Sequence, residues 1–175
     1  MQRWRVPLGF ACAALFLFFS RANVWTLVIG AFVSLPGLAL RAWASGHLKK
    51  NEALATTGPY AYTRNPLYLG SFLIGLGFTI AAGRPIPAII FIVMVLGIYL
   101  PVMRVEAQTL EELFGKKYKR YASEVPLLWP RLSRYRKLNE NKFDSALYLR
   151  YREYRAALGV VIAWTLLALK MIYFK

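Results

Sequence analysis

Five long apolar stretches dominate the 175-residue sequence and restrict what the chain can fold into. They cover residues 4–19, 22–44, 66–82, 85–103 and 156–174. A helix needs about 20 residues to cross a bilayer, and it satisfies its own backbone hydrogen bonds where no water is available. The sequence therefore predicts an all-α integral membrane protein with five transmembrane helices.

The composition argues against the simpler soluble classes. Hydrophobic residues make up 58% of the chain, yet the formal net charge is +15. A soluble domain of this size cannot bury so much apolar surface, and a nucleic-acid-binding protein would explain the charge without the apolar content. The same apolar content excludes intrinsic disorder. A single cysteine, Cys12, and a single histidine, His47, argue against internal disulfides, metal clusters and a Ser-His-Asp triad.

The first apolar stretch has a second interpretation, as a secretory signal peptide. Arg3 and Arg5 precede it, as in the basic region of such a peptide. No small-x-small cleavage site follows, and the second stretch begins almost at once. We therefore expect a retained membrane helix.

The basic residues predict the orientation of the chain. Five crossings would place 19 of the 23 Lys and Arg residues on one side and 4 on the other. Because cytoplasmic segments are enriched in Lys and Arg, the amino terminus, the 45–65 loop and the 104–155 segment are expected in the cytoplasm. The carboxyl terminus is then expected on the opposite side.

The 104–155 segment is expected to form two further helices. Apolar residues from Leu110 to Val125 recur at spacings of three and four, which predicts an amphipathic helix along the membrane surface. A second helix is predicted from Phe143 to Arg155, continuing into the fifth crossing. Its alternating Tyr and Arg residues favour contacts with anionic lipid headgroups over nucleic acid.

Two polar segments are candidates for a functional site. Residues 58–70 read Gly-Pro-Tyr-Ala-Tyr-Thr-Arg-Asn-Pro-Leu-Tyr-Leu-Gly, with Asn65 as the expected N-cap of a helix that starts at Pro66. This stretch alone fits a plain helix start as well as a ligand site. The second segment is Arg104-Val105-Glu106, where either Arg104 or Arg64 could pair with the carboxylate. A tight turn at residues 83–84 predicts that the two segments meet in space.

These segments together resemble the isoprenylcysteine carboxyl methyltransferase family and the related phospholipid N-methyltransferases. The resemblance covers residues 45–130. It is carried by Gly58–Gly70 and then by Glu106, Leu110, Phe114-Gly115, Tyr118, Tyr121, Val125-Pro126 and Pro130. The glycine loop of soluble Rossmann methyltransferases is absent, and Gly70, Gly75 and Gly77 are interpreted as helix-packing residues.

The resemblance implies that S-adenosylmethionine binds on the cytoplasmic side, without a metal. Glu106 would receive the amino group of the cofactor, and Arg104 would orient the carboxylate of a lipophilic acceptor that enters from the bilayer. Asn65 stands where the family has histidine, and Ala107 replaces a frequent second glutamate. The implied cofactor-binding residues are Leu54, Ala55, Tyr60, Arg64, Asn65, Pro66, Leu67, Tyr68 and Glu106.

The chemistry mildly favours transfer to oxygen. Displacement at a sulfonium is helped mainly by alignment and exclusion of water, and a carboxylate acceptor needs no general base. The alternatives are a phospholipid N-methyltransferase, an NADPH-dependent membrane reductase and a non-catalytic lipid-binding protein. Residues 1–130 are expected to form the membrane methyltransferase core with its cofactor site, and residues 131–175 a basic helix plus the fifth crossing.

Overall fold

The computed structural model describes residues 14–49, 52–135 and 142–173 and is entirely helical apart from loops in these parts of the chain. Residues 14–19 are helical at the start of the described chain. The main helices that follow are α2 (Val24–Ser45), α3 (Pro66–Ala82), α4 (Pro85–Met94), α5 (Leu100–Phe114), α6 (Lys116–Glu124), α7 (Ser145–Arg150) and α8 (Tyr154–Tyr173). A 3₁₀ turn covers Gly58–Ala61 and a π-helical segment covers Val95–Tyr99.

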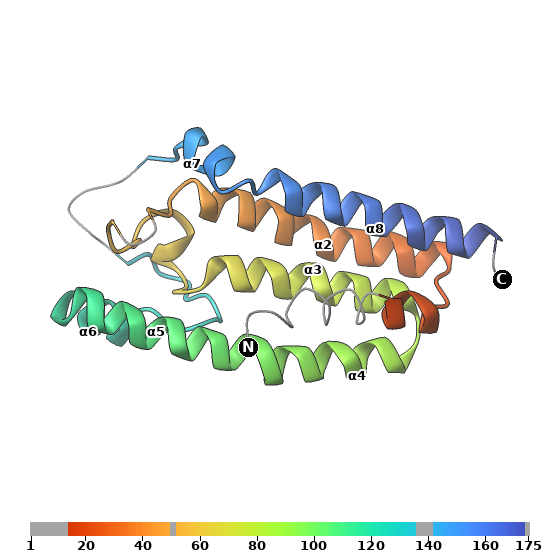
Figure 1. Ribbon diagram of the computed structural model, residues 1–175, viewed down its shortest axis with the longest axis horizontal. Helices are drawn as coiled ribbons and strands as arrows, with labels where there is room; N and C mark the ends of the chain where they lie inside the picture. Colours follow the sequence, from red (N-terminus) through yellow and green to blue (C-terminus); the bar gives the residue numbers. More distant parts are fainter. Residues whose placement is uncertain (1–13, 50–51, 136–141, 174–175) are drawn as a thin grey trace.

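The long helices lie side by side along one direction (Figure 1). Helix α3 lies between α2 and the rod formed by α4 and α5, and α8 runs along the other side of α2. The loops that follow α2 and α6 gather with α7 at one end of this arrangement. That end is where the two candidate polar segments were expected to meet.

Glycines allow α2 and α3 to approach closely. A Cβ atom built on Gly70 would lie 2.7 Å from the carbonyl oxygen of Gly37, and one on Gly77 would lie 2.4 Å from that of Gly30. Small residues at such positions let helix backbones touch, as is common between membrane helices. The prediction that Gly70 and Gly77 serve helix packing is confirmed, and Gly75 likewise meets the ring of Phe91.

The boundaries of α3 follow from its terminal residues. Pro66 occupies the first turn, where a missing N–H is harmless. Gly83 ends the helix in the left-handed region, at φ 61°, and its N–H donates to the carbonyl of Ile80. Pro85 then starts α4 directly. The predicted third crossing, 66–82, therefore coincides with α3.

Helices α4 and α5 form one rod together with the π-helical segment between them. The rod covers 30 residues, Pro85–Phe114, which corresponds to about 45 Å. The apolar core of a bilayer is only about 30 Å thick. The rod is therefore longer than this core. Its charged residues lie in α5, which indicates that the carboxyl-terminal part of α5, with Glu106, extends beyond the core.

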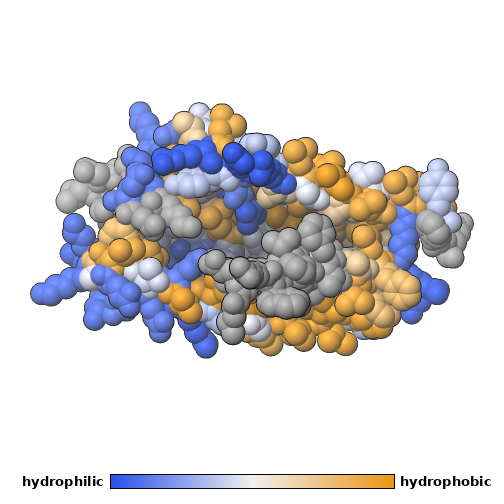
Figure 2. All heavy atoms as spheres, in the orientation of Figure 1, coloured by the Kyte–Doolittle hydropathy of each residue, from blue (hydrophilic) through white to orange (hydrophobic). Residues whose placement is uncertain are grey.

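Within the described residues, three helices are long and apolar enough to cross a membrane: α2, the α4–α5 rod and α8. Helix α3 is apolar but shorter, and only residues 14–19 of the first predicted crossing are described. The hydrophilic surface gathers at the end formed by α5, α6 and α7, while hydrophobic surface dominates the rest of the visible face (Figure 2). The fold is thus helical with at least three membrane-competent helices, and five crossings stay a prediction.

Three expectations about the 104–155 segment need correction. The helix predicted over 110–125 is split, because Gly115 adopts φ 51° between α5 and α6. The apolar face of α6 does not lie free for a membrane surface: Tyr118 and Tyr121 are buried against other parts of the chain. The helix predicted over 143–155 also does not continue into α8, since a turn at residues 151–153 separates α7 from α8 and gives Arg152 a φ of 55°.

Candidate functional site

A cavity of about 720 Å³ lies where the loop before α3 meets α5 and α6. This volume is within the range of roughly 300–1,000 Å³ that is typical of small-ligand sites. All nine residues that the sequence analysis assigned to cofactor binding line the cavity, from Leu54 and Ala55 through Tyr60, Arg64, Asn65, Pro66, Leu67 and Tyr68 to Glu106. The predicted convergence of the two polar segments is confirmed.

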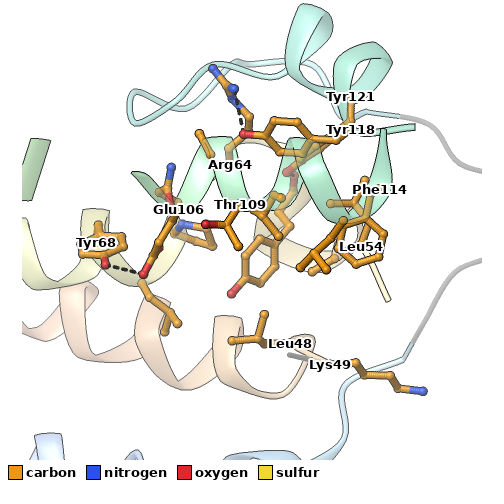
Figure 3. A pocket seen from close by; sticks show the side chains of 18 of the residues that line it. Leu48, Lys49, Leu54, Arg64, Tyr68, Glu106, Thr109, Phe114, Tyr118 and Tyr121 are labelled. Atoms are coloured by element: carbon orange, nitrogen blue, oxygen red, sulfur yellow. Dashed lines mark hydrogen bonds between the residues drawn. The ribbon is translucent and has the colours of Figure 1, made fainter. Parts of the chain in front are cut away.

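The contact between these segments is a direct hydrogen bond. The Tyr68 hydroxyl, from the first turn of α3, donates to Oε1 of Glu106 on α5 at 2.9 Å (Figure 3). The Tyr99 ring packs edge-on against that of Tyr68 at 5.8 Å between centroids. Tyr99 ends the π-helical segment, and such segments often occur at functional sites because they change the direction in which side chains point.

The loop that carries Tyr60 is held by the segment that follows α6. The backbone N–H of Arg64 donates to the Pro126 carbonyl, and the N–H groups of Arg131 and Tyr135 donate to the carbonyls of Tyr62 and Ala61, each at 2.9 Å. These three bonds run side by side and fix the loop from Ala61 to Arg64. No sequence pattern predicted this role for residues 126–135.

Asn65 occupies the N-cap position of α3, as predicted, but its side chain does not cap the helix. Its Nδ2 donates instead to the Leu127 carbonyl at 2.9 Å. The Thr63 hydroxyl donates to the neighbouring carbonyl of Leu128 at 2.8 Å. Asn65 therefore helps to hold the 126–135 segment against the loop while it also lines the cavity.

Tyrosines from α6 form a wall of the cavity. The Tyr121 hydroxyl donates to the Tyr60 carbonyl at 2.7 Å, and the Tyr118 hydroxyl accepts from Nη1 of Arg64 at 3.2 Å. Figure 3 shows both tyrosines with Phe114 and Leu54 on the side of the cavity away from Tyr68 and Glu106. The Nε atom of Arg64 is buried without a hydrogen-bond partner, which leaves a donor available to a ligand.

The titratable groups near the cavity differ in their capacity to act as bases. Burial raises the pKa of both Tyr60 and Tyr121, so these phenols hold their protons at neutral pH. Burial, and secondarily the charge of Arg134, lowers the pKa of His47. His47 packs against the start of the loop before α3, with its Nδ1 3.3 Å from the Thr57 hydroxyl. It is not among the cavity-lining residues. Glu106 is the cavity-lining carboxylate among the described residues.

Not every predicted site residue reaches the cavity. Arg104 is exposed on α5 and does not line it. Conversely, the sequence analysis assigned no role to Arg41 and Ser71, which do line it. Arg41 had a recognisable signal, because a charge inside an apolar stretch marks a functional position in many membrane proteins. Cys12 lies outside the described residues.

The described residues include no group of three or more His, Cys, Asp or Glu side chains that could hold a metal ion. The candidate site is therefore an aromatic and apolar cavity with one carboxylate, and the guanidinium groups of Arg41 and Arg64 at its edges.

Comparisons with known proteins agree with this geometry. A family described as phospholipid methyltransferase matches residues 4–117. The cobalt-zinc-cadmium resistance protein CzcN of Cupriavidus metallidurans is 32% identical over 142 residues, which are 76% of this chain and 64% of that protein. Protein-S-isoprenylcysteine O-methyltransferase B of Arabidopsis thaliana is 32% identical over 112 residues, 61% of this chain and 57% of that protein.

A further relative is the protein-S-isoprenylcysteine O-methyltransferase of Schizosaccharomyces pombe, 26% identical over 105 residues, 57% of this chain and 44% of that protein. The chain thus spans less than two thirds of the length of these relatives. No solved structure matches the chain significantly.

Proposed function

Since this chain belongs to the phospholipid methyltransferase family, we propose that it is a membrane methyltransferase that uses S-adenosylmethionine and methylates the carboxylate of a lipophilic acceptor. The observation that carries the proposal is the Tyr68–Glu106 hydrogen bond, which joins two distant segments at one cavity. The names of two relatives, which are isoprenylcysteine O-methyltransferases, support oxygen as the methylated atom.

The side chains around the cavity fit the chemistry of this cofactor. Its ammonium group would bind the carboxylate of Glu106, which Tyr68 already orients. Its adenine would lie among apolar and aromatic groups such as Leu54, Phe114 and Tyr118. The unpaired Nε of Arg64 offers a buried donor for an acceptor atom. When bound, the cofactor supplies an electrophilic methyl group on a sulfonium.

The residues of this chain contribute orientation and exclusion of water. The loop at residues 58–65 and the α6 tyrosines close the cavity on two sides. A displacement reaction is accelerated mainly by alignment of the two reactants and by exclusion of water. A carboxylate acceptor reacts without losing a proton. Because burial raises the pKa of Tyr60 and Tyr121, both phenols stay protonated at neutral pH and cannot accept a proton from an ammonium group. This favours the carboxylate acceptor.

Phospholipid N-methylation is the second candidate, because the description of the matching family names phospholipids. An ammonium acceptor must first lose a proton, and Glu106 is the group in the cavity that could accept it. The location of the site is also part of the proposal. The excess of Lys and Arg on one side of the predicted crossings supports a cytoplasmic cavity.

Cofactor titration of the purified protein in detergent tests the proposal. S-adenosylmethionine and, separately, NADPH are titrated into the wild type, Glu106→Gln and Tyr68→Phe. We expect S-adenosylmethionine to bind the wild type, with about tenfold or greater weakening in Glu106→Gln, as for loss of a hydrogen bond to a charged group. Glu111→Gln is the matched control, because Glu111 lies on the same helix as Glu106 but forms an exposed ion pair with Lys119 of α6. Binding of NADPH alone, or of neither cofactor, refutes the proposal.

A labelled-methyl assay with a lipid extract then identifies the acceptor atom. Products labile to mild base are esters and support the carboxylate acceptor, whereas base-stable products indicate N-methylation. Arg104→Gln belongs in the same assay, because the predicted role of Arg104 requires slower transfer with unchanged cofactor affinity.

A further inference from the structure

Arg41 of α2 forms a largely buried, bidentate ion pair with Glu153, 112 residues further along the chain. Its Nη2 lies 2.9 Å from both carboxylate oxygens and its Nε lies 3.2 Å from Oε2. The two side chains are only 21% and 13% exposed. A buried ion pair is weak evidence for stability, because desolvation offsets much of the attraction. Stability alone therefore does not explain why these charges are placed here.

Arg41 also borders two cavities. Towards α3, its Nη1 donates to the Ser71 hydroxyl at 2.6 Å and to the Leu67 carbonyl at 3.3 Å, and on this side it lines the cavity with Tyr68 and Glu106. Towards α8 it lines a second cavity of about 230 Å³. The apolar residues of this second cavity are Leu38, Ala39, Ala42, Ala156 and Ala157. Of the two arginines that line the larger cavity, Arg64 does not reach the smaller one.

Glu153 reaches Arg41 from a strained turn. It lies between α7 and α8, directly after Arg152, whose φ of 55° is unfavourable for a residue other than glycine. Such strain persists only when surrounding contacts enforce it. Here these contacts are the ion pair between Glu153 and Arg41 and local backbone hydrogen bonds, among them one from the Glu153 N–H to the Tyr148 carbonyl. Release of Glu153 from Arg41 would remove one of the contacts that enforce the strain, which makes the exchange of this carboxylate for another one easier.

We propose that Arg41 binds the carboxylate of the lipophilic acceptor, and that Glu153 occupies the position of this carboxylate until the acceptor replaces it. The inference rests on the proposed function, since it requires an acceptor with a carboxylate. The apolar chain of the acceptor would enter between α2 and α8, along the smaller cavity. The carboxylate would then meet the larger cavity at Arg41, which bonds Ser71, three residues after Tyr68 on α3. This assigns α8 a function, namely one wall of the acceptor site.

Direct binding of a charged probe and a neutral probe tests the exchange. The probes are S-farnesyl-N-acetylcysteine and its carboxamide, titrated without cofactor into protein in detergent, with empty micelles as the blank. We expect the wild type to bind the carboxylate about tenfold or more tightly than the carboxamide, in line with hydrogen bonds to a charged group. Arg41→Gln should abolish this preference.

Glu153→Gln separates exchange from a purely structural ion pair. It removes the competing charge, so we expect the affinity for the carboxylate probe to rise several-fold although the melting temperature falls. A structural pair predicts that affinity and melting temperature fall together. Arg150 and Glu52 form an exposed pair at 3.8 Å near the same turn. Arg150→Gln and Glu52→Gln are therefore matched controls, and neither should change the affinity for the probe.

Equal binding of the two probes by the wild type overturns the inference, and so does weaker carboxylate binding by Glu153→Gln. If Arg41→Gln does not fold, these two measurements still decide. Neither requires methyl transfer. A protein that prefers the carboxylate but transfers no methyl group therefore contradicts the proposed function alone. Methyl transfer without any preference for the carboxylate contradicts only the role of Arg41.

Discussion

Substitution of Gly70 by alanine tests how the packing of α2 on α3 supports the candidate site. Gly70 lies in α3 after Tyr68, and its Cα hydrogen faces α2. A Cβ atom there would lie 2.7 Å from the Gly37 carbonyl oxygen and 2.6 Å from Cγ of Arg41. The Arg41 side chain could adjust, but the Gly37 backbone cannot move without its helix.

The expected magnitude follows from this distance. Ordinary van der Waals contact begins at 3.4 Å, so α2 and α3 must move apart locally by about 0.7 Å. This movement breaks other close contacts between the two helices. Forcing an extra methyl group into a packed interior costs about 1–3 kcal/mol. The higher helix propensity of alanine compared with glycine offsets about 0.5–1 kcal/mol of this cost. We therefore expect a net destabilisation of roughly 0.5–2 kcal/mol.

Thermal unfolding in detergent, followed by tryptophan fluorescence, measures this effect. Gly159→Ala is the matched control, since Gly159 lies within α8 and a Cβ there meets nothing within 4 Å. We expect Gly159→Ala to be neutral or stabilising and Gly70→Ala to melt lower. The affinity for S-adenosylmethionine should also fall in Gly70→Ala, because the same shift moves Tyr68 relative to Glu106. If Gly70→Ala melts at or above the wild type, the close approach of the two helices is not what supports this site.

Three further substitutions have defined outcomes in the same unfolding assay. Tyr121→Phe should destabilise the protein by about 1–3 kcal/mol, because the buried Tyr60 carbonyl loses its partner, whereas Tyr173→Phe at an exposed position should have no effect. Burial lowers the pKa of His47 below its usual 6.5, so below this pH the unfolded chain binds more protons than the folded one. The free energy of unfolding therefore falls as the pH drops from 6.5, and His47→Asn should flatten this pH dependence. Lys170→Met should lower the melting temperature, whereas Lys170→Arg should not, because the ammonium group donates to the carbonyls of Phe18 and Ser20 at the carboxyl-terminal end of the helical residues 14–19.

The boundaries of three of the long apolar helices could be predicted closely from the sequence. The predicted stretch 66–82 coincides with α3, and the stretches 22–44 and 156–174 differ from α2 and α8 by two residues or fewer at each end where the structure describes them. Long apolar stretches bounded by Asn, Gly and Pro leave few alternatives, because a chain in lipid must satisfy its backbone groups internally.

The irregular backbone positions could not be predicted in the same way. The π-helical segment at Val95–Tyr99 lies within a continuous apolar stretch and has no local sequence signal. Gly115 did carry a signal, since glycine tolerates its φ of 51°, but the periodic apolar pattern on both sides favoured one helix. The break at Arg152 accompanies an ion pair between Glu153 and Arg41, a residue far away in the chain, which no local pattern reveals.

Nine of the residues that line the cavity could be named from the sequence, because they belong to two linear motifs that the family resemblance links. The 126–135 segment and the α6 tyrosines were recognised only as helix and loop. Their hydrogen bonds to Tyr60 and to the loop at 61–65 connect residues about 60 or more positions apart. Such contacts depend on the complete fold, and periodicity gives no information about which carbonyl a tyrosine or asparagine will reach.

Arg41 shows why a charge near the end of a membrane helix need not serve the adjacent loop. Helical side chains point towards the amino terminus of their own helix. Gly30 of α2 faces Gly77 of α3, and Gly37 faces Gly70. The two helices are therefore antiparallel, and each residue further along α2 lies opposite a residue one position earlier in α3. This register places the backbone of Arg41 level with Pro66. Its guanidinium bonds Ser71, more than one turn further from the loop. The charge is thus directed into the helix bundle, where it needs the carboxylate of Glu153 or that of a ligand. A lysine or arginine at the amino-terminal end of α3 would point the other way, towards solvent, and would need no such partner.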